Sequence, residues 1–283
     1  MVASRYSLAG IRSATTQPQE QLIAHALDVL RADERVLAAW LVGSFATGEA
    51  DPWSDVDLHF LVTDAGADDL KDSWRELLDR MTPTVMAQPF YAGSNGGYAI
   101  TPEWVHIDLA FHREGTLDPK TVEGMSPLLD KRGDLLPDRP TPRPPFVGEP
   151  YFPADTVDFF FYMFGNLVVV VGRNEPAWAM NGVITLRDYG LVPLMVEERG
   201  VRKQGGNKRQ NPFLSEEQQQ VLLDLPPIGP TIDSVIDAEV AIARDFIPRG
   251  RSLARNVGAS WPEAFEHATV RRIEDAFGLT VLE

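Results

Sequence analysis

The stretch LVGSFATGEADPWSDVDLHFLV, residues 41–62, decides the fold. An apolar run ends at Gly43 and Ser44, a small and polar loop follows, and Asp55 and Asp57 open a second apolar run. Two carboxylates one residue apart on a strand point to the same face. Because like charges this close repel each other unless a cation lies between them, the pair predicts a site for a divalent metal ion.

The Gly-Ser pair before the loop suits a phosphate group. Gly43 would let the backbone approach a ligand closely, and Ser44 offers a hydroxyl and backbone N–H groups. Metal ligands and a phosphate cradle on adjacent strands indicate nucleotide chemistry. The alternative for the aspartates is a turn or helix-cap role, because the pattern S-D-x-D on its own is common.

Together, Gly43, Ser44, Gly48 and the S-D-x-D-L pattern at residues 54–58 resemble the signature of the nucleotidyltransferase superfamily of polymerase-beta type. In size and in its mostly helical second half, the chain is most similar to the antibiotic nucleotidyltransferases that modify aminoglycosides or lincosamides. The resemblance implies Mg²⁺-dependent transfer of a nucleoside monophosphate, with AMP from ATP as the expected donor group, onto a small-molecule hydroxyl. It further implies two Mg²⁺ ions bridged by Asp55 and Asp57.

That family has a third carboxylate on a later strand, and the segment WVHIDLAFH, residues 104–112, supplies Asp108. The resemblance implies that Asp108 completes the metal site and takes the proton of the acceptor hydroxyl. A salt bridge is the alternative role for Asp108, and Glu103 is an alternative base. Three histidines share faces with these aspartates and are interpreted as packing or supporting residues, since aspartates suit Mg²⁺ better than zinc: His59, His106 and His112. Four aromatic residues are candidates for stacking on adenine but are interpreted as core: Trp40, Trp53, Tyr91 and Trp104.

A triphosphate is strongly negative, so a cation from the second half of the chain is expected to bind it. The segment RGVRKQGGNKRQN, residues 199–211, is locally basic, and Lys208 matches a G-x-K-R-like segment of the related antibiotic enzymes. Arg187, in a predicted helix, is a second phosphate candidate. A solvated loop is the alternative interpretation of the basic segment.

Periodicity predicts an α/β (α+β) fold with a small mixed sheet followed by a helical bundle. The expected strands are 36–42, 56–62, 84–91, 97–101 and 104–112, and the expected helices are 17–31, 68–81, 156–171, 178–198, 215–225, 231–246 and 261–277, with a strand as the alternative at 168–171. Seven prolines exclude regular structure from residues 137–153. We therefore expect a nucleotidyltransferase catalytic domain at 1–136, a proline-rich linker at 137–153 and a helical substrate- and phosphate-binding domain at 154–283.

Composition narrows the function. The 283 residues carry a net charge of −15, which disfavours nucleic acid as a partner and suits a cationic small molecule. The chain has no cysteine, and we recognise neither a signal peptide nor a membrane span, so we expect a cytoplasmic protein without a membrane partner. Oligomeric state stays open. The alternatives are a nucleotidyltransferase that modifies a protein or tRNA, as in toxin–antitoxin systems, and a non-catalytic nucleotide-binding regulator.

Overall fold

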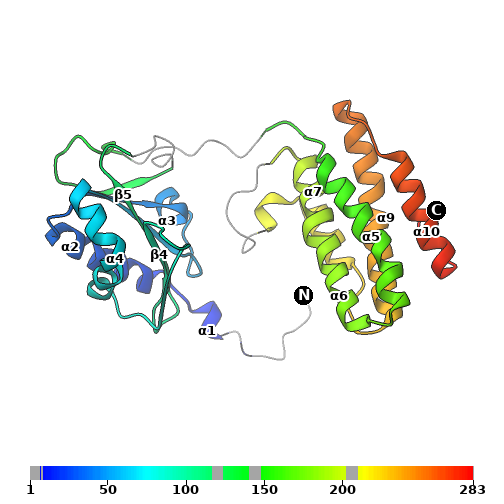
Figure 1. Ribbon diagram of the computed structural model, residues 1–283, viewed down its shortest axis with the longest axis horizontal. Helices are drawn as coiled ribbons and strands as arrows, with labels where there is room; N and C mark the ends of the chain where they lie inside the picture. Colours follow the sequence, from blue (N-terminus) through cyan, green and yellow to red (C-terminus); the bar gives the residue numbers. More distant parts are fainter. Residues whose placement is uncertain (1–6, 8, 117–123, 140–147, 202–209, 283) are drawn as a thin grey trace. The chain divides into compact units, whose positions relative to one another are not determined.

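The chain divides into two compact units, Met1–Pro144 and Pro145–Glu283 (Figure 1). The computed structural model describes residues 7, 9–116, 124–139, 148–201 and 210–282. The first unit holds the sheet and the second is helical, which confirms the predicted fold class. The predicted domain limits at 136 and 154 stay a prediction.

Unit 1 is built on a six-stranded mixed sheet with the strand order β3-β4-β5-β2-β1-β6. Its strands are β1 (Val36–Val42), β2 (Val56–Val62), β3 (Met86–Pro89), β4 (Gly96–Ile100), β5 (His106–Arg113) and β6 (Ser126–Asp130). Strands β2 and β5 pair in parallel, and every other neighbouring pair is antiparallel. Strand β6 was not predicted.

Two helices cover one face of this sheet. They are α2 (Gln17–Ala32) and α4 (Asp64–Met81), which pack Leu30 and Leu70 against Leu58, Phe60 and Phe111 in one buried cluster. Helix α4 begins four residues earlier than predicted, because the Thr63 hydroxyl accepts a hydrogen bond from Gly66 N and caps it. Since strand side chains alternate, the intervening residues of β2 and β5 lie on the opposite face.

The described part of unit 1 also contains the short helices α1 (Ala9–Arg12) and α3 (Gly43–Thr47). The predicted turn at Gly43 and Ser44 is in fact the start of α3, so the phosphate-loop candidate is a single helical turn that follows β1 directly. Helix α3 ends at Gly48, whose φ of 74° is the left-handed conformation that glycine adopts at helix ends.

Unit 2 is a helical bundle. Its elements are α5 (Ala154–Gly172), α6 (Pro176–Thr185), the π-helix η2 (Leu186–Leu191), α7 (Val192–Glu198), the 3₁₀-helix η3 (Asn211–Phe213), α8 (Glu216–Asp224), α9 (Ile232–Val257) and α10 (Glu263–Phe277). A capping box formed by Ser215 and Gln218 opens α8. The strand alternative at 168–171 is wrong, because α5 is helical throughout.

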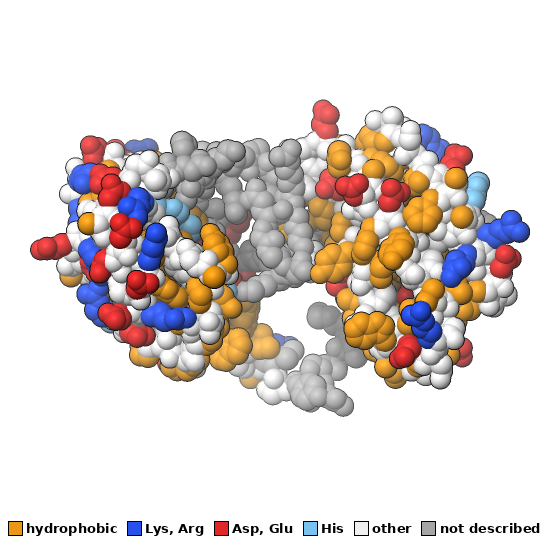
Figure 2. Space-filling model, viewed as in Figure 1, with side chains coloured by type: hydrophobic (Ala, Val, Ile, Leu, Met, Phe, Trp, Pro, Cys, Tyr) orange, Lys and Arg blue, Asp and Glu red, His pale blue; other side chains and the backbone are white. Residues whose placement is uncertain are grey.

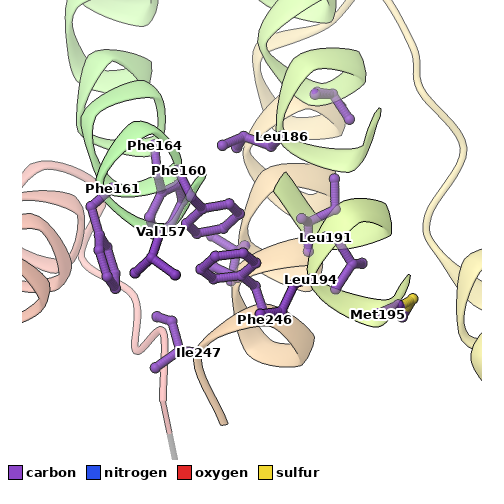
Figure 3. Packing of buried hydrophobic residues seen from close by; sticks show 14 of the residues in the cluster. Val157, Phe160, Phe161, Phe164, Leu186, Leu191, Leu194, Met195, Phe246 and Ile247 are labelled. Carbon is purple, nitrogen blue, oxygen red and sulfur yellow. The ribbon is translucent and has the colours of Figure 1, made fainter. Parts of the chain in front are cut away.

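Stacked phenylalanines form the core of unit 2. The rings of Phe160 on α5 and Phe246 on α9 lie parallel with centroids 3.6 Å apart, and both are fully buried (Figure 3). Gly190 in η2 lies against this stack, where an added Cβ would come within 2.7 Å of Phe160 Cδ2. The predicted helix 178–198 thus contains a π-helical turn at Gly190 that packs closely against α5.

Helix α5 is long and apolar enough to cross a membrane by length and composition alone. Its Phe160, Phe161 and Phe164 are buried in the bundle, as in the core helix of a globular unit. Phe159 and Tyr162 are exposed, and Figure 2 shows apolar side chains gathered on the visible face of unit 2.

The stacked pair predicts that alanine substitutions at two neighbouring residues differ greatly in their effect on stability. Phe160→Ala should lower the free energy of unfolding of unit 2 by about 3–5 kcal/mol, because it leaves a cavity beside Phe246. The control Phe159→Ala removes a ring that is 40% exposed and should cost less than about 1 kcal/mol. Urea unfolding followed by circular dichroism measures both, and equal losses would contradict the packing.

Candidate active site at one edge of the sheet

The three predicted carboxylates of unit 1 meet where β2 and β5 begin. Asp57 and Asp108 are register partners on these parallel strands, and both lie on the face that α2 and α4 leave uncovered. Neighbouring strands lie about 4.8 Å apart, so the two side chains stand next to each other. Asp55 immediately precedes β2. Glu103, the alternative base, lies in the exposed turn before β5.

His106 lies between two of these carboxylates. Its Nδ1 is 3.3 Å from Asp55 Oδ1, and its Nε2 is 3.1 Å from Asp108 Oδ1. The Nε2 atom is buried and lies within hydrogen-bonding distance of this Asp108 oxygen, although the ring N–H is not well aligned with it. The carboxylate of Asp108, and then that of Asp55, raise the pKa of His106 to about 9 against the opposing effect of burial. The imidazolium is therefore the cation between these carboxylates at neutral pH.

Gly43 brings the backbone against Asp57. Val42, the last residue of β1, pairs with Asp57, and a Cβ added to Gly43 would lie 2.2 Å from Asp57 Oδ2. The φ of Gly43 is 68°, a conformation that disfavours any residue with a side chain. Ser44 follows as the second residue of α3. The phosphate-loop candidate and the metal-ligand candidates thus share one edge of the sheet.

Aromatic rings border the carboxylates on the β4 side. Tyr98 is the register partner of Asp108, and its ring meets His106 edge-on with centroids 6.0 Å apart. Phe90 stacks beyond Tyr98 at 6.4 Å. The interpretation of the four stacking candidates as core holds for Trp40, which is fully buried. It is wrong for the other three, which are exposed: Trp53, Tyr91 and Trp104.

The other two histidines pack farther along the same face. His112 Nε2 and His59 Nδ1 are 3.1 Å apart and share a hydrogen bond, and Trp40 stacks on His112 with centroids 5.3 Å apart. Burial, and then the nearby His112, lower the pKa of His59 to about 4. Both rings therefore make the contacts of neutral packing residues.

The carboxylates suit Mg²⁺ in chemistry but are not assembled around a metal ion. Among the residues that the structure describes, no three His, Asp or Glu side chains form a group that could hold one. Asp55, Asp57 and Asp108 supply the oxygen ligands that Mg²⁺ prefers. Because His106 lies between Asp55 and Asp108, the imidazole would have to give way to a metal ion.

The candidates of the second half lie in unit 2 or outside the described residues. Arg187 is in η2, where its Nε donates to Asp188 Oδ1 at 2.7 Å. Lys208 lies outside the described residues. Unit 2 also contains a hollow of about 910 Å³, and its lining includes Glu149, Tyr151 and Asn256. All residues that line this hollow belong to unit 2.

Two features of the site were missed in the sequence. The alternation of residues 104–112 places His106 on the face of Asp108, but the contact with Asp55 requires knowing that β5 lies beside β2. No sequence signal pairs Tyr98 with Asp108, because the order of the edge strands cannot be read from periodicity.

Comparison with known families gives a match in unit 1. The family described as "Nucleotidyltransferase domain" matches residues 23–83. This range contains Gly43, Ser44, Asp55 and Asp57, and it ends before Asp108. Comparison with curated proteins gives no match.

Several solved structures are similar at low scores. An aminoglycoside 6-adenyltransferase from Bacillus subtilis has a TM-score of 0.43 and 16% identity, over 91% of this chain and 98% of that chain. A STING-associated CdnE c-di-GMP synthase from Capnocytophaga granulosa has a TM-score of 0.29 and 11% identity, over 86% and 80% of the two chains. The E. coli MS115-1 CdnC:HORMA-deltaN complex has a TM-score of 0.25 and 13% identity, over 97% and 92%. Scores this low do not identify a substrate.

The close approach at Gly43 predicts that alanine costs more stability there than at Gly48, which has a similar positive φ. Gly48→Ala introduces a Cβ at φ 74° with nothing within 4 Å, so it should cost about 1–2 kcal/mol from the backbone alone. Gly43→Ala adds a clash with Asp57 and should cost more. Thermal unfolding of both variants measures the difference, and equal melting temperatures would contradict the contact.

The position of His106 predicts its titration in protein freed of metal ions with a chelator. By NMR, its ring should titrate near pH 9 instead of its ordinary 6.5, and Asp108→Asn or Asp55→Asn should lower that pKa. Because the folded-state pKa is raised, this interaction stabilises the protein fully below about pH 6.5 and is lost as the pH rises through about 9. A titration near 6.5 in the unsubstituted protein would contradict the bridging geometry.

Proposed function

We propose that this chain, whose residues 23–83 match the nucleotidyltransferase domain family, transfers a nucleoside monophosphate from a nucleoside triphosphate to the hydroxyl of a small molecule. The expected donor is ATP, and an aminoglycoside or lincosamide is the leading acceptor. The observation that carries the proposal is the pairing of Asp57 with Asp108 beside Gly43 at one edge of the sheet.

Each residue at this edge has a proposed role. Asp55, Asp57 and Asp108 would hold two Mg²⁺ ions, which when bound would neutralise charge on the triphosphate and on the pyrophosphate that leaves. Gly43 lets the backbone approach the phosphates, and the Ser44 hydroxyl donates a hydrogen bond to one of their oxygens. Arg187 and Lys208 are the proposed phosphate cations of the second half.

Asp108 is the proposed general base. It would accept the proton of the acceptor hydroxyl as the oxygen attacks the α-phosphorus, a contribution of roughly 10²–10⁴-fold when well placed. Its position next to Asp57 supports this role over Glu103, which lies in the exposed turn before β5. His106 would then keep Asp55 and Asp108 in place while no metal ion is bound.

The proposed acceptor is cationic. The net charge of −15 attracts cations over long range and repels the phosphates of nucleic acid, so a tRNA acceptor is disfavoured. We propose a cytoplasmic enzyme without a membrane partner.

The carboxylates can be tested by three single substitutions. Asp55→Asn, Asp57→Asn and Asp108→Asn each remove a charge with little change in shape, and each should lower kcat by at least about 100-fold while the protein stays folded. The assay is pyrophosphate release from ATP, GTP, CTP and UTP with Mg²⁺, across aminoglycosides and lincosamides. Asp28→Asn is the matched control and should leave kcat unchanged, because the Asp28 side chain on α2 is 72% exposed.

The outcomes separate the candidate functions. Acceptor-dependent release that requires all three aspartates supports the proposal, and retained activity in both the Asp55 and Asp57 variants would rule out their metal role. Release that needs a protein or tRNA acceptor would favour the toxin–antitoxin alternative. ATP binding without turnover on any acceptor would favour a regulatory protein.

A further inference from the structure

Trp104 has an exposure and a backbone conformation that are both unfavourable for a tryptophan. Its side chain is 80% exposed, and its φ is 64°, in the left-handed region that glycine prefers. Among the described residues, the other position with positive φ that is not glycine is Asn174, a residue type that tolerates this conformation. The Trp104 ring contributes little burial to the fold, and glycine would fit this backbone conformation better. A role other than folding therefore explains the tryptophan.

The turn that holds Trp104 is firmly built. Trp104 N donates to Thr101 O at 3.0 Å, Thr101 N donates to Val105 O at 3.0 Å, and Val105 N donates to Thr101 Oγ1 at 3.1 Å. Thr101 is buried. Strained backbone of this kind persists where the surroundings over-determine it, and it gathers at ligand sites. The indole is thus presented to solvent on a rigid support.

Trp104 lies at the carboxylate edge. It is two residues before His106, which contacts Asp55 and Asp108. Trp53, 58% exposed, precedes Val56 by three residues, just as Trp104 precedes Ile107, the register partner of Val56. Its turn is also fixed, since Trp53 N donates to Asp51 Oδ1 at 2.9 Å. Two exposed indoles therefore stand at the starts of the two strands that carry the aspartates.

The in-line geometry of the proposed reaction indicates which of its two substrates would lie near Trp104. In an in-line displacement, the attacking hydroxyl and the leaving pyrophosphate lie on opposite sides of the α-phosphorus. Gly43 and Ser44 follow β1, whereas Trp104 lies in the turn between β4 and β5, beyond Asp108 in the strand order. If the pyrophosphate lies by Gly43, the acceptor lies on the side of Trp104.

We propose that Trp104 binds the acceptor by stacking its indole against a cationic ring, with Glu103 beside it as the nearest carboxylate in sequence. A tryptophan face attracts ammonium and guanidinium groups, and the net charge of −15 favours the same class of ligand. The proposal deepens the proposed function and rests on it for the direction of the acceptor. Trp104 is here a specificity-determining residue and takes no part in proton transfer.

The test measures binding, so it needs no turnover. Calorimetry at low salt would follow kanamycin, streptomycin and lincomycin as ring cations, spermidine as a linear cation and ATP with Mg²⁺. Each acceptor is titrated with and without a non-hydrolysable ATP analogue. Trp104→Gly should weaken binding of at least one ring cation by roughly 5–30-fold, Trp104→Phe should recover most of it, and the affinities for spermidine and ATP should not change.

Two controls isolate the ring from the backbone. Trp178→Ala removes an indole that is 69% exposed in unit 2 and should leave every affinity unchanged. Trp104→Gly should raise the melting temperature by roughly 2–4 °C through relief of strain, whereas Asn174→Gly should change it less.

Each result decides the proposal. Weaker ATP binding with unchanged acceptor binding would overturn it in favour of base stacking, and unchanged affinities throughout would overturn it outright. Absence of binding of every ring cation to the unsubstituted protein would also overturn it. Loss of the proposed function would appear separately, as missing pyrophosphate release in a protein that still binds these ligands.

Discussion

The parallel pairing of β2 with β5 is the interaction on which the candidate site depends. It is held in register by apolar pairs that α2 and α4 bury, among them Leu58 with Leu109 and Phe60 with Phe111. A shift by one residue would turn every apolar side chain toward the open face. Burial on one face therefore fixes the position of Asp57 beside Asp108 on the other.

Such a cluster of carboxylates costs free energy unless positive charge compensates it. In this structure the compensation comes from His106, whose contacts with Asp55 and Asp108 raise its pKa. The same arrangement explains why the predicted ligands gather without forming a metal site: a protein cation stands between two of them. A divalent ion carries more charge than an imidazolium, so under the proposed function a bound metal ion would replace the His106 ring between the carboxylates.

Local patterns in the sequence predicted the elements whose periodicity is strong. They did not predict contacts that depend on which strands pair. β1, β2 and the mixed α/β class were predicted, because their apolar runs and the glycine at residue 43 carry clear signals. β6 was missed because SPLLD is short and starts with a turn-like pair. The predicted end of α9 at 246 was too early. The helix continues through Pro248, because its apolar face packs on both sides of that residue. His106 and Tyr98 needed the strand order.

Three departures from local preference meet at this edge of the sheet: a glycine against a carboxylate, paired carboxylates on neighbouring strands, and an exposed tryptophan with positive φ. Elsewhere in the chain, the helix starts at Thr63, Ser215 and Thr231 follow the ordinary capping rules. Where a sequence follows local rules at its helix ends, departures from those rules elsewhere are expected at functional sites. Under the proposed function, ligands account for the strain at this edge: we propose that the phosphates lie on the side of Gly43 and the acceptor on the side of Trp104.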